Sequence, residues 1–205
     1  MAKELSPEAL EEKTAKANKN TYEWIQSLVF ALILCVFVFL FVVRVVEVKG
    51  SSMLPTLVNG DKMIVSGIFY NPKPGDVVVL QKDEYDPNKD LVKRVIATEG
   101  QVINIDFDQG IVYIDGRQIE EDYINDLTHN KLDFIGPKTV PEGCVFVMGD
   151  NRNASTDSRK SEIGMVDTRQ IVGKVYAVVF PTTRLQAIER GEQKIVEQTE
   201  AKADA

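Results

Sequence analysis

LVFALILCVFVFLFVV, residues 28–43, is the stretch that decides what kind of fold this chain can have. With its flanks the apolar segment extends from Trp24 to Val46, and as a helix it would be roughly 34 Å long. That length is enough to cross the hydrocarbon core of a bilayer. Tyr22 and Trp24 suit one membrane interface, and Arg44 can extend its guanidinium to the other. The segment therefore predicts a transmembrane helix.

Two other interpretations of the apolar run are a buried core helix and a cleaved signal peptide. A core helix would carry polar residues at helical spacing, and residues 28–43 carry none. A signal peptide has a shorter apolar region followed by a small-x-small site. Here no small residue follows before Gly50. The prediction is one uncleaved span over residues 24–46.

The charges on the two sides of this span indicate its orientation. More positive charge precedes it than follows it, which favours an N-terminus inside the cell. We expect residues 1–23 to be a cytoplasmic tail of a single-pass protein of the cell membrane. An extracytoplasmic domain would then cover residues 47–183, and a polar, frayed tail would cover residues 184–205. The residues that set this bias are Lys3, Lys13, Lys16 and Lys19 before the span, against Arg44 and Lys49 after it.

Charge and cysteine content exclude several classes of protein. The 205 residues carry a formal net charge of −7, which argues against nucleic acid as a partner. It also argues against electrostatic adhesion to anionic lipid, so attachment to a bilayer must be hydrophobic. Cys35 in the span and Cys144 far downstream could not meet to form a disulfide. Two cysteines and one histidine match no usual metal spacing, and we expect neither metal nor cofactor.

Short apolar runs separated by turn residues follow the span and predict strands. Asp115-Gly116 is typical of a hairpin turn, and residues 71–75 form another turn region. No long amphipathic helical period appears before Arg184. The predicted fold is mainly β, an antiparallel β-sheet or barrel-like domain preceded by one N-terminal transmembrane helix. The expected strands are Val45–Lys49, Lys62–Ile68, Asp76–Gln81, Val92–Thr98, Gln101–Phe107, Ile111–Ile114, Cys144–Met148 and Ile171–Phe180.

The first segment that could carry chemistry is GSSMLPTL, residues 50–57. Gly50 allows close backbone approach, and Pro55 constrains a turn. Small neighbours leave the hydroxyl and the amide of Ser52 accessible. On its own the segment could equally be an ordinary turn.

The second segment is LVKRVIA, residues 91–97, in which two adjacent cations lie inside an apolar, strand-like run. Alternation along a strand directs Lys93 and Arg94 to opposite faces, so we expect one to face solvent and the other to be buried. Burial lowers the proton affinity of a lysine amine, and a neutral amine can act as a general base. The alternative is two exposed charges on an edge strand.

The third segment is MGDNRNASTDSR, residues 148–159, which is dense in turn formers and hydrogen-bonding side chains. These residues predict a structured loop with Asp–Arg pairs. The alternative is a surface loop with solvated charges. Because the segment directly follows the apolar run Cys144–Met148, we expect it to be held against a core strand.

Taken together, the segments resemble those of type I signal peptidases, the membrane-bound serine proteases that remove signal peptides from exported proteins. Residues 50–57 look like the box around the nucleophile, and residues 75–79 like a structural box. Residues 93–95 look like the box of the general base, and residues 149–159 like the last box. Each box alone is weak, but four in order behind a membrane span are specific. The resemblance extends from the span to about Pro181.

The resemblance implies a Ser–Lys dyad, with Ser52 as the nucleophile and neutral Lys93 as the general base. The backbone N–H of Ser52 would donate one hydrogen bond to the oxyanion. One branch of the family has a second donor, a serine, at the position of Gly50, so that donor is unnamed here. The supporting residues implied by the last box are Ser155, which would hydrogen-bond the lysine amine, an Asp157–Arg159 ion pair, and Asp150 and Arg152 as braces of the loop.

The expected partners are preproteins that carry signal peptides and, through one helix, the lipid bilayer. An extended peptide could add to the backbone near residues 49–51 and 91–93, with small side chains before the cleavage point as in A-x-A sites. His129 lies in a polar loop and is not expected to be catalytic. Nothing requires more than a monomer. The pocket residues expected for the small side chains are Gly50, Met53, Leu57 and Val92.

Two other functions remain open from the residues alone. One is a Ser–Lys peptidase with a single dedicated substrate. The other is a single-span, anchored, non-enzymatic β domain that binds peptides, in which the serine segment and the Lys93-Arg94 pair would be coincidental.

Overall fold

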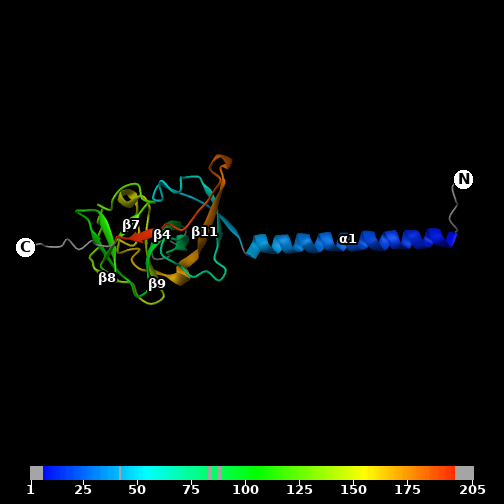
Figure 1. Ribbon diagram of the computed structural model, residues 1–205, viewed down its shortest axis with the longest axis horizontal. Helices are drawn as coiled ribbons and strands as arrows, with labels where there is room; N and C mark the ends of the chain where they lie inside the picture. The colour runs from blue at the N-terminus through cyan, green and yellow to red at the C-terminus, as the bar shows by residue number, and fades with distance from the viewer. Residues whose placement is uncertain (1–6, 42, 83–84, 87–88, 197–205) are drawn as a thin grey trace, which may run out of the picture. The chain divides into compact units, whose positions relative to one another are not determined.

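The computed structural model describes residues 7–41, 43–82, 85–86 and 89–196. The chain divides into two units, a helical one up to Val43 and a β-rich one from Arg44 (Figure 1).

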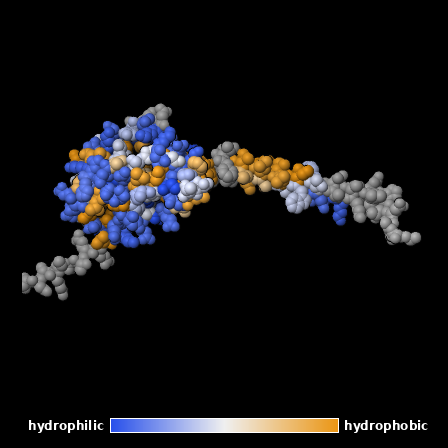
Figure 2. All heavy atoms as spheres, turned by 90° about the horizontal axis from the view of Figure 1, so that it is seen from above, coloured by the Kyte–Doolittle hydropathy of each residue, from blue (hydrophilic) through white to orange (hydrophobic). Residues whose placement is uncertain are grey.

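The helical unit consists of one long helix, α1 (Pro7–Phe41). Proline stands at its first position, where the missing N–H costs no hydrogen bond, and no glycine or second proline interrupts it. Residues Lys19–Phe37 are long and apolar enough to cross a membrane. Every side chain in that stretch is exposed, and Figure 2 shows the apolar surface along it. A helix that exposes apolar residues around its circumference is suited to lipid.

The helix bounds differ from the predicted span of residues 24–46. The helix begins earlier, at Pro7, and ends at Phe41, because strand β1 (Arg44–Glu47) already occupies the last residues of the predicted span. Valines dominate this end of the span, and their branched Cβ favours a strand over a helix where a pairing partner exists. That partner is β2 (Lys62–Ser66), with Arg44 opposite Val65.

The β unit contains two antiparallel sheets, which confirms the predicted fold class. In the larger sheet the strand order is β1-β2-β11-β3-β4-β9-β10, and β12 also pairs with β11. Its further strands are β3 (Val77–Gln81), β4 (Asp90–Thr98), β9 (Cys144–Met148), β10 (Val166–Asp167), β11 (Ile171–Phe180) and β12 (Gln186–Ala187). Single 3₁₀ turns lie at Arg152–Ala154, Thr168–Gln170 and Thr182–Arg184.

The smaller sheet has the order β13-β7-β6-β5-β8. The predicted turn at Asp115-Gly116 is confirmed, since both residues have positive φ and join β6 to β7 as a two-residue hairpin. The sequence did not indicate β7, β8 or β13, which are short or mainly polar. The strands of this sheet are β5 (Val102–Asp106), β6 (Ile111–Ile114), β7 (Arg117–Glu121), β8 (Lys138–Thr139) and β13 (Gln193–Ile195).

Both faces of the central strands are covered. In β3, alternate valines belong to different buried clusters: Val77 and Val79 pack in one and Val78 in another. A strand buried on both faces has a continuous apolar sequence. Strand β4 is buried in the same way, at every residue from Leu91 to Ala97. A polar side chain on either face of β4 is therefore removed from water.

The expectation of a frayed tail from Arg184 onward is wrong for residues 184–196. Strand β12 pairs with β11, and β13 pairs with β7. Between them Ile188 is buried in the core of the larger sheet. The segment is polar, yet it is ordered because backbone hydrogen bonds and ion pairs hold it, such as that from Arg184 to Asp61 at 3.2 Å. Residues 197–205 lie outside the described residues.

Asp76, at the start of β3, joins three parts of this unit. Its buried carboxylate accepts hydrogen bonds from the Tyr70 hydroxyl (2.9 Å), Lys174 Nζ (2.7 Å) and Arg190 Nε (2.9 Å). Burial alone would raise the pKa of Asp76, but the bonds from Arg190, Lys174 and Tyr70 outweigh it and hold the pKa below its usual value. Asp76 therefore stabilises the fold at pH values above the carboxyl pKa of the unfolded chain, and this is lost as the pH falls through the lowered value.

We expect Asp76→Asn to lower the free energy of unfolding by about 2 kcal/mol, less than for a fully buried pair because both partner cations are partly exposed. That loss should lower the Tm of the β unit by about 4–8 °C, measured by circular dichroism in detergent. The matched control is Asp167→Asn, which removes an ion pair to the exposed Arg169 and should change the free energy of unfolding by less than about 0.5 kcal/mol. Equal Tm values for the two variants would contradict the assigned role of Asp76.

Candidate active site

Ser52, in a turn, lies against Lys93 of strand β4 although 41 positions separate the two residues in sequence. Lys93 Nζ donates to Ser52 Oγ at 2.8 Å. Ser52 lies in a compact turn that is closed by a hydrogen bond from Leu57 N to Met53 O (2.9 Å). The side chains of Met53 and Leu57 are both buried in the core, and they anchor the turn on either side of its exposed residues.

Lys93 is the side chain of this pair that burial changes chemically. It is 3% exposed and also donates to the carbonyl oxygen of Val92 at 2.9 Å. Burial lowers the pKa of Lys93 to about 8 from its ordinary value near 10.5. The negative charges of Asp157 and Asp150 oppose this shift, and Lys89 and Arg159 reinforce it. A substantial share of the amine is therefore neutral near pH 8.

Both faces of β4 are buried, so the expectation that one of the two adjacent cations faces solvent is wrong. Arg94 is 2% exposed. Its Nε and Nη2 atoms donate to the two oxygens of Asp150 at 2.8 and 2.6 Å. A bidentate, charge-assisted pair of this kind compensates a buried guanidinium. Arg94 therefore keeps its charge inside the sheet.

The loop of residues 149–159 is held by its own charged side chains. Asp157 and Arg159 form a buried ion pair, with Arg159 Nη2 2.8 Å from Asp157 Oδ2. The same carboxylate accepts the Gly149 N–H at 3.0 Å. A Cβ on Gly149 would lie 2.3 Å from Ser155 Oγ and 2.4 Å from the Ser52 carbonyl oxygen. Glycine at this position thus allows the loop to lie directly against Ser52.

Asn151 is a site residue to which the sequence analysis assigned no role. Its backbone N–H donates to the carbonyl oxygen of Ser52 at 3.0 Å, and its Nδ2 atom donates to the carbonyl oxygen of Ser51 at 3.1 Å. These two bonds clamp the backbone of the serine. Asn151 lies in the last box of the sequence, but its bond to a residue 99 positions away can be recognised only from the tertiary structure.

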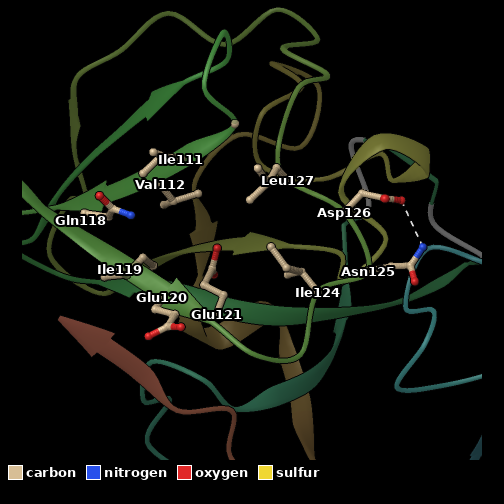
Figure 3. A pocket seen from close by; sticks show the side chains of 11 residues that line it. Ile111, Val112, Gln118, Ile119, Glu120, Glu121, Ile124, Asn125, Asp126 and Leu127 are labelled. Atoms are coloured by element: carbon tan, nitrogen blue, oxygen red, sulfur yellow. Dashed lines mark hydrogen bonds between the residues drawn. The ribbon is translucent and has the colours of Figure 1, made fainter. Parts of the chain in front are cut away.

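Arg152 braces the loop against the smaller sheet and does not pair with Asp150. Its two terminal nitrogens each lie 2.6 Å from an oxygen of Glu121, at the end of β7. Burial alone would lower the pKa of Arg152, but the Glu121 carboxylate outweighs it and raises the pKa. Glu121 also lines a pocket between β6, β7 and the loop around Leu127, which Figure 3 shows. The pocket is lined by neither Ser52 nor Lys93.

The expected hydrogen bond from the lysine amine to Ser155 is absent. Ser155 Oγ is buried, and no hydrogen-bond partner lies within reach in the described part of the chain. Burial would raise the pKa of Asp157, but Arg159, the Gly149 N–H and the nearby Ser155 together hold it below its usual value. The amine instead donates to Ser52 Oγ and to the Val92 carbonyl oxygen.

A cleft of about 170 Å³ opens beside Ser52 and Lys93. Three of the expected pocket residues, Gly50, Met53 and Val92, line it. The expectation for Leu57 is wrong: it is fully buried in the core and does not line the cleft. The Gly50 N–H is already bonded to Asn59 Oδ1 at 2.9 Å, so this amide is not the second oxyanion donor.

His129 and the acidic residues form no alternative centre. His129 is exposed and its Nδ1 atom lies 3.0 Å from the Phe107 carbonyl oxygen, among hydrogen bonds of the loop that packs on Asn153. Within residues 7–196, leaving out the undescribed positions, no group of three or more metal-ligating side chains is found.

A serine hydroxyl bonded to a buried lysine amine on an antiparallel β scaffold is the arrangement expected of serine hydrolases in which lysine takes the place of histidine. Residues 21–180 match the family model described as "Signal peptidase, peptidase S26". Signal peptidase I of Bacillus licheniformis is 34% identical over 190 residues, covering 86% of this chain and 97% of the relative. Signal peptidase IB of Staphylococcus aureus is 35% identical over 181 residues, covering 80% and 91%.

A solved structure of a signal peptidase I from Enterococcus faecalis is 28% identical, covers 51% of this chain and 97% of its own, and has a TM-score of 0.43. On the family match and the curated relatives, the chain belongs to the signal peptidase family, peptidase S26. It is a serine endopeptidase. The alternative of a non-enzymatic peptide-binding domain is thereby excluded.

We expect the Lys93 amine to titrate near pH 8, about two units below an exposed lysine. The measurement is an NMR titration of lysine Cε resonances, with Lys93→Arg to assign the signal. Since the folded pKa lies below the unfolded one, the unfolded chain binds more protons between the two values. Stability contributed by Lys93 should therefore rise with pH from about 8 to about 10.5. A Lys93 signal that titrates with the exposed lysines would refute the effect of burial.

Proposed function

We propose that the chain cleaves signal peptides from exported preproteins, with Ser52 as the nucleophile and Lys93 as the general base. The observation that carries the proposal is the 2.8 Å hydrogen bond between Ser52 Oγ and an amine whose burial lowers its pKa to about 8. A base with a pKa near the working pH combines availability of its neutral form with driving force for proton transfer. Family membership supports the coarser activity, signal peptide cleavage.

In the acylation step, neutral Lys93 takes the hydroxyl proton while Ser52 Oγ attacks the scissile carbonyl carbon. The Ser52 backbone N–H donates to the oxyanion that forms. Protonated Lys93 then passes its proton to the leaving amine, and the peptide bond breaks to leave an ester on Ser52. A water deprotonated by Lys93 attacks this ester, the bond from the acyl carbon to Ser52 Oγ breaks, and Ser52 Oγ takes the proton from Lys93 as the signal peptide leaves with a free carboxylate.

The loop of residues 149–159 keeps Ser52 Oγ and Lys93 Nζ at the distance and orientation that proton transfer needs. Asn151 holds the Ser52 carbonyl oxygen, and the Asp157–Arg159 pair holds the loop beside it. Asp150 and Arg152 fasten the loop in opposite directions, to Arg94 in the larger sheet and to Glu121 in the smaller one. We assign these four charged residues positioning roles, since none of them bonds to Ser52 Oγ or Lys93 Nζ.

The substrate would lie extended in the cleft beside Ser52, between residues 49–51 and 91–93. Both segments line the cleft, and their backbone could bond a peptide as an added strand. Met53 and Val92 line the cleft, and we propose that they restrict it to small side chains, as small-x-small sites require. All residues named come from one chain, and we propose that it acts as a monomer without a metal or cofactor.

Replacing Ser52 or Lys93 by alanine should reduce kcat for cleavage by at least about 10³-fold, because each removal abolishes the attack step. The test uses purified full-length protein in detergent, a preprotein with an Ala-x-Ala site and mass spectrometry of the products. Lys131→Ala, in an exposed loop, is the matched control and should retain activity.

A second preprotein with leucine in place of the last alanine should be cleaved far more slowly, because the narrow cleft excludes it. Cleavage that survives Ser52→Ala or Lys93→Ala would refute the dyad. Cleavage of one preprotein alone from a panel with Ala-x-Ala sites would favour a peptidase with a single dedicated substrate.

We further propose that α1 crosses the membrane once, with its N-terminal end in the cytoplasm and residues 47–183 outside. The apolar stretch Lys19–Phe37 and the lysine excess before it support this orientation. Protease added to spheroplasts should digest the β domain and spare an epitope tag placed before residue 20. Digestion of the tag with protection of the domain would show the opposite orientation, and permeabilised cells, in which both are digested, are the control.

A further inference from the structure

The polar C-terminal segment, residues 184–196, contacts both sheets. Strand β12 pairs with β11 of the larger sheet, and β13 pairs with β7 of the smaller one. Gln193 Nε2 also donates to the carbonyl oxygen of Ile96, in β4, at 3.2 Å. The turn between β12 and β13 carries Arg190 and Gly191, and the mechanism above uses neither residue.

Arg190 and Gly191 bond to Asp76 and Gly75, the two residues directly before β3. Arg190 Nε donates to Asp76 Oδ1 at 2.9 Å, and Gly191 N donates to the Gly75 carbonyl oxygen at 3.1 Å. The same Gly75 oxygen accepts a hydrogen bond from Arg94 Nη1 at 2.8 Å. The C-terminal segment and the buried guanidinium of Arg94 therefore meet at one carbonyl oxygen.

Gly191 also confines that guanidinium sterically. Arg94 Cζ lies 3.9 Å from the centre of the Tyr123 ring, a cation–π contact. A Cβ on Gly191 would lie 2.3 Å from Tyr123 Cδ1 and 2.8 Å from Arg94 Nη1, distances that real Cβ atoms essentially never show. Any side chain at position 191 must therefore displace the ring, the guanidinium or the segment itself.

From Arg94 the contacts continue to the nucleophile. Arg94 holds both oxygens of Asp150, at 2.8 and 2.6 Å. The next residue, Asn151, clamps the carbonyl oxygens of Ser52 and Ser51. The position of the guanidinium thus sets where the loop holds the Ser52 backbone.

We propose that Arg190 and Gly191 are positioning residues of the active site, which act through Arg94 on the backbone of Ser52; this inference rests on the proposed function. Displacing the guanidinium moves the Asp150 carboxylate and, through Asn151, shifts Ser52 relative to the Lys93 amine. A shift of about 1 Å at reacting atoms can cost about 10²-fold in rate. Peptide binding in the cleft uses other atoms, so kcat falls while KM changes little.

The same displacement changes the charge that Lys93 meets. When Arg94 neutralises Asp150 less completely, the carboxylate favours the protonated amine. The acid limb of the profile of kcat against pH then moves to higher pH. A variant that merely contains less folded protein would leave the pH of that limb unchanged. The charged groups that face Lys93 are Asp150, Asp157 and Arg159 on the loop, and Lys89 and Lys49, which line the cleft.

The test compares Gly191→Ala, Arg190→Ala and Arg190→Lys with two controls in the full-length protein in detergent. Gly164→Ala is the control for backbone strain without a side-chain clash, since its Cβ would meet nothing closer than 3.4 Å while its positive φ of 55° strains an alanine there. Arg169→Ala is the charge control, since it removes an exposed ion pair. For each variant, kcat and KM for an Ala-x-Ala preprotein are measured from about pH 6 to about pH 10. Rates are corrected for the folded fraction from circular dichroism, and the Lys93 amine is titrated by NMR.

For Gly191→Ala we expect kcat to fall at least about 10-fold with KM within about 3-fold, and both the acid limb and the Lys93 titration to move to higher pH. Arg190→Ala should show a smaller change in the same direction, because Asp76 keeps Lys174, and Arg190→Lys should restore activity.

A corrected kcat for Gly191→Ala within about 2-fold of Gly164→Ala, or an unmoved Lys93 titration, would overturn the proposal. If Gly191→Ala does not fold, an unmoved acid limb in Arg190→Ala overturns it. Absence of cleavage by the unchanged protein would instead refute the proposed function, and the NMR titration would still decide the positioning role.

Discussion

Burial of two cations at neighbouring positions of one strand is the constraint on which the rest of the β unit depends. Strand β4 is covered on both faces, so Lys93 and Arg94 are only 3% and 2% exposed. Arg94 meets a bidentate carboxylate, Asp150, and keeps its charge. Within the described residues, Lys93 bonds only to a hydroxyl and a backbone carbonyl, and burial lowers its pKa to about 8. The same desolvation thus gives a structural cation on one face and a base on the other, because their partners differ.

The arginines on the loop and on β4 connect that strand to the rest of the fold. Asp150 faces the larger sheet through Arg94, and Arg152 faces the smaller sheet through Glu121. These charged pairs have almost no exposure, so removing one member would leave its partner uncompensated, a cost of several kcal/mol. A loop attached at both sides by such pairs cannot drift away from Ser52. The ion pairs that fasten the loop to the two sheets therefore help to keep Ser52 Oγ and Lys93 Nζ in place.

Prediction from sequence succeeded where a feature is local. The strands Ile111–Ile114, Cys144–Met148 and Ile171–Phe180 have the predicted bounds, because apolar runs between turn residues contain the needed information. Prediction failed where contacts with residues distant in the sequence determine whether a side chain is buried or a segment is ordered. Arg94 was open to either face, Leu57 was expected in the cleft, and residues 184–196 were expected to fray. In each case a partner far along the chain, such as Asp150 for Arg94, makes the buried or ordered state lower in free energy than the exposed or frayed one.

The sequence by itself determined that this chain has an apolar helix before a β domain and that a serine, a lysine and an Asp–Arg-rich loop follow in the order of the signal peptidase family. It did so because periodicity and composition are properties of short segments. Only the tertiary structure decided that Ser52 Oγ and Lys93 Nζ lie 2.8 Å apart, that Ser155 Oγ has no hydrogen-bond partner among the described residues, and that Asn151 holds the serine backbone. These contacts depend on strand pairing and desolvation, which arise only when segments far apart in the sequence are packed together.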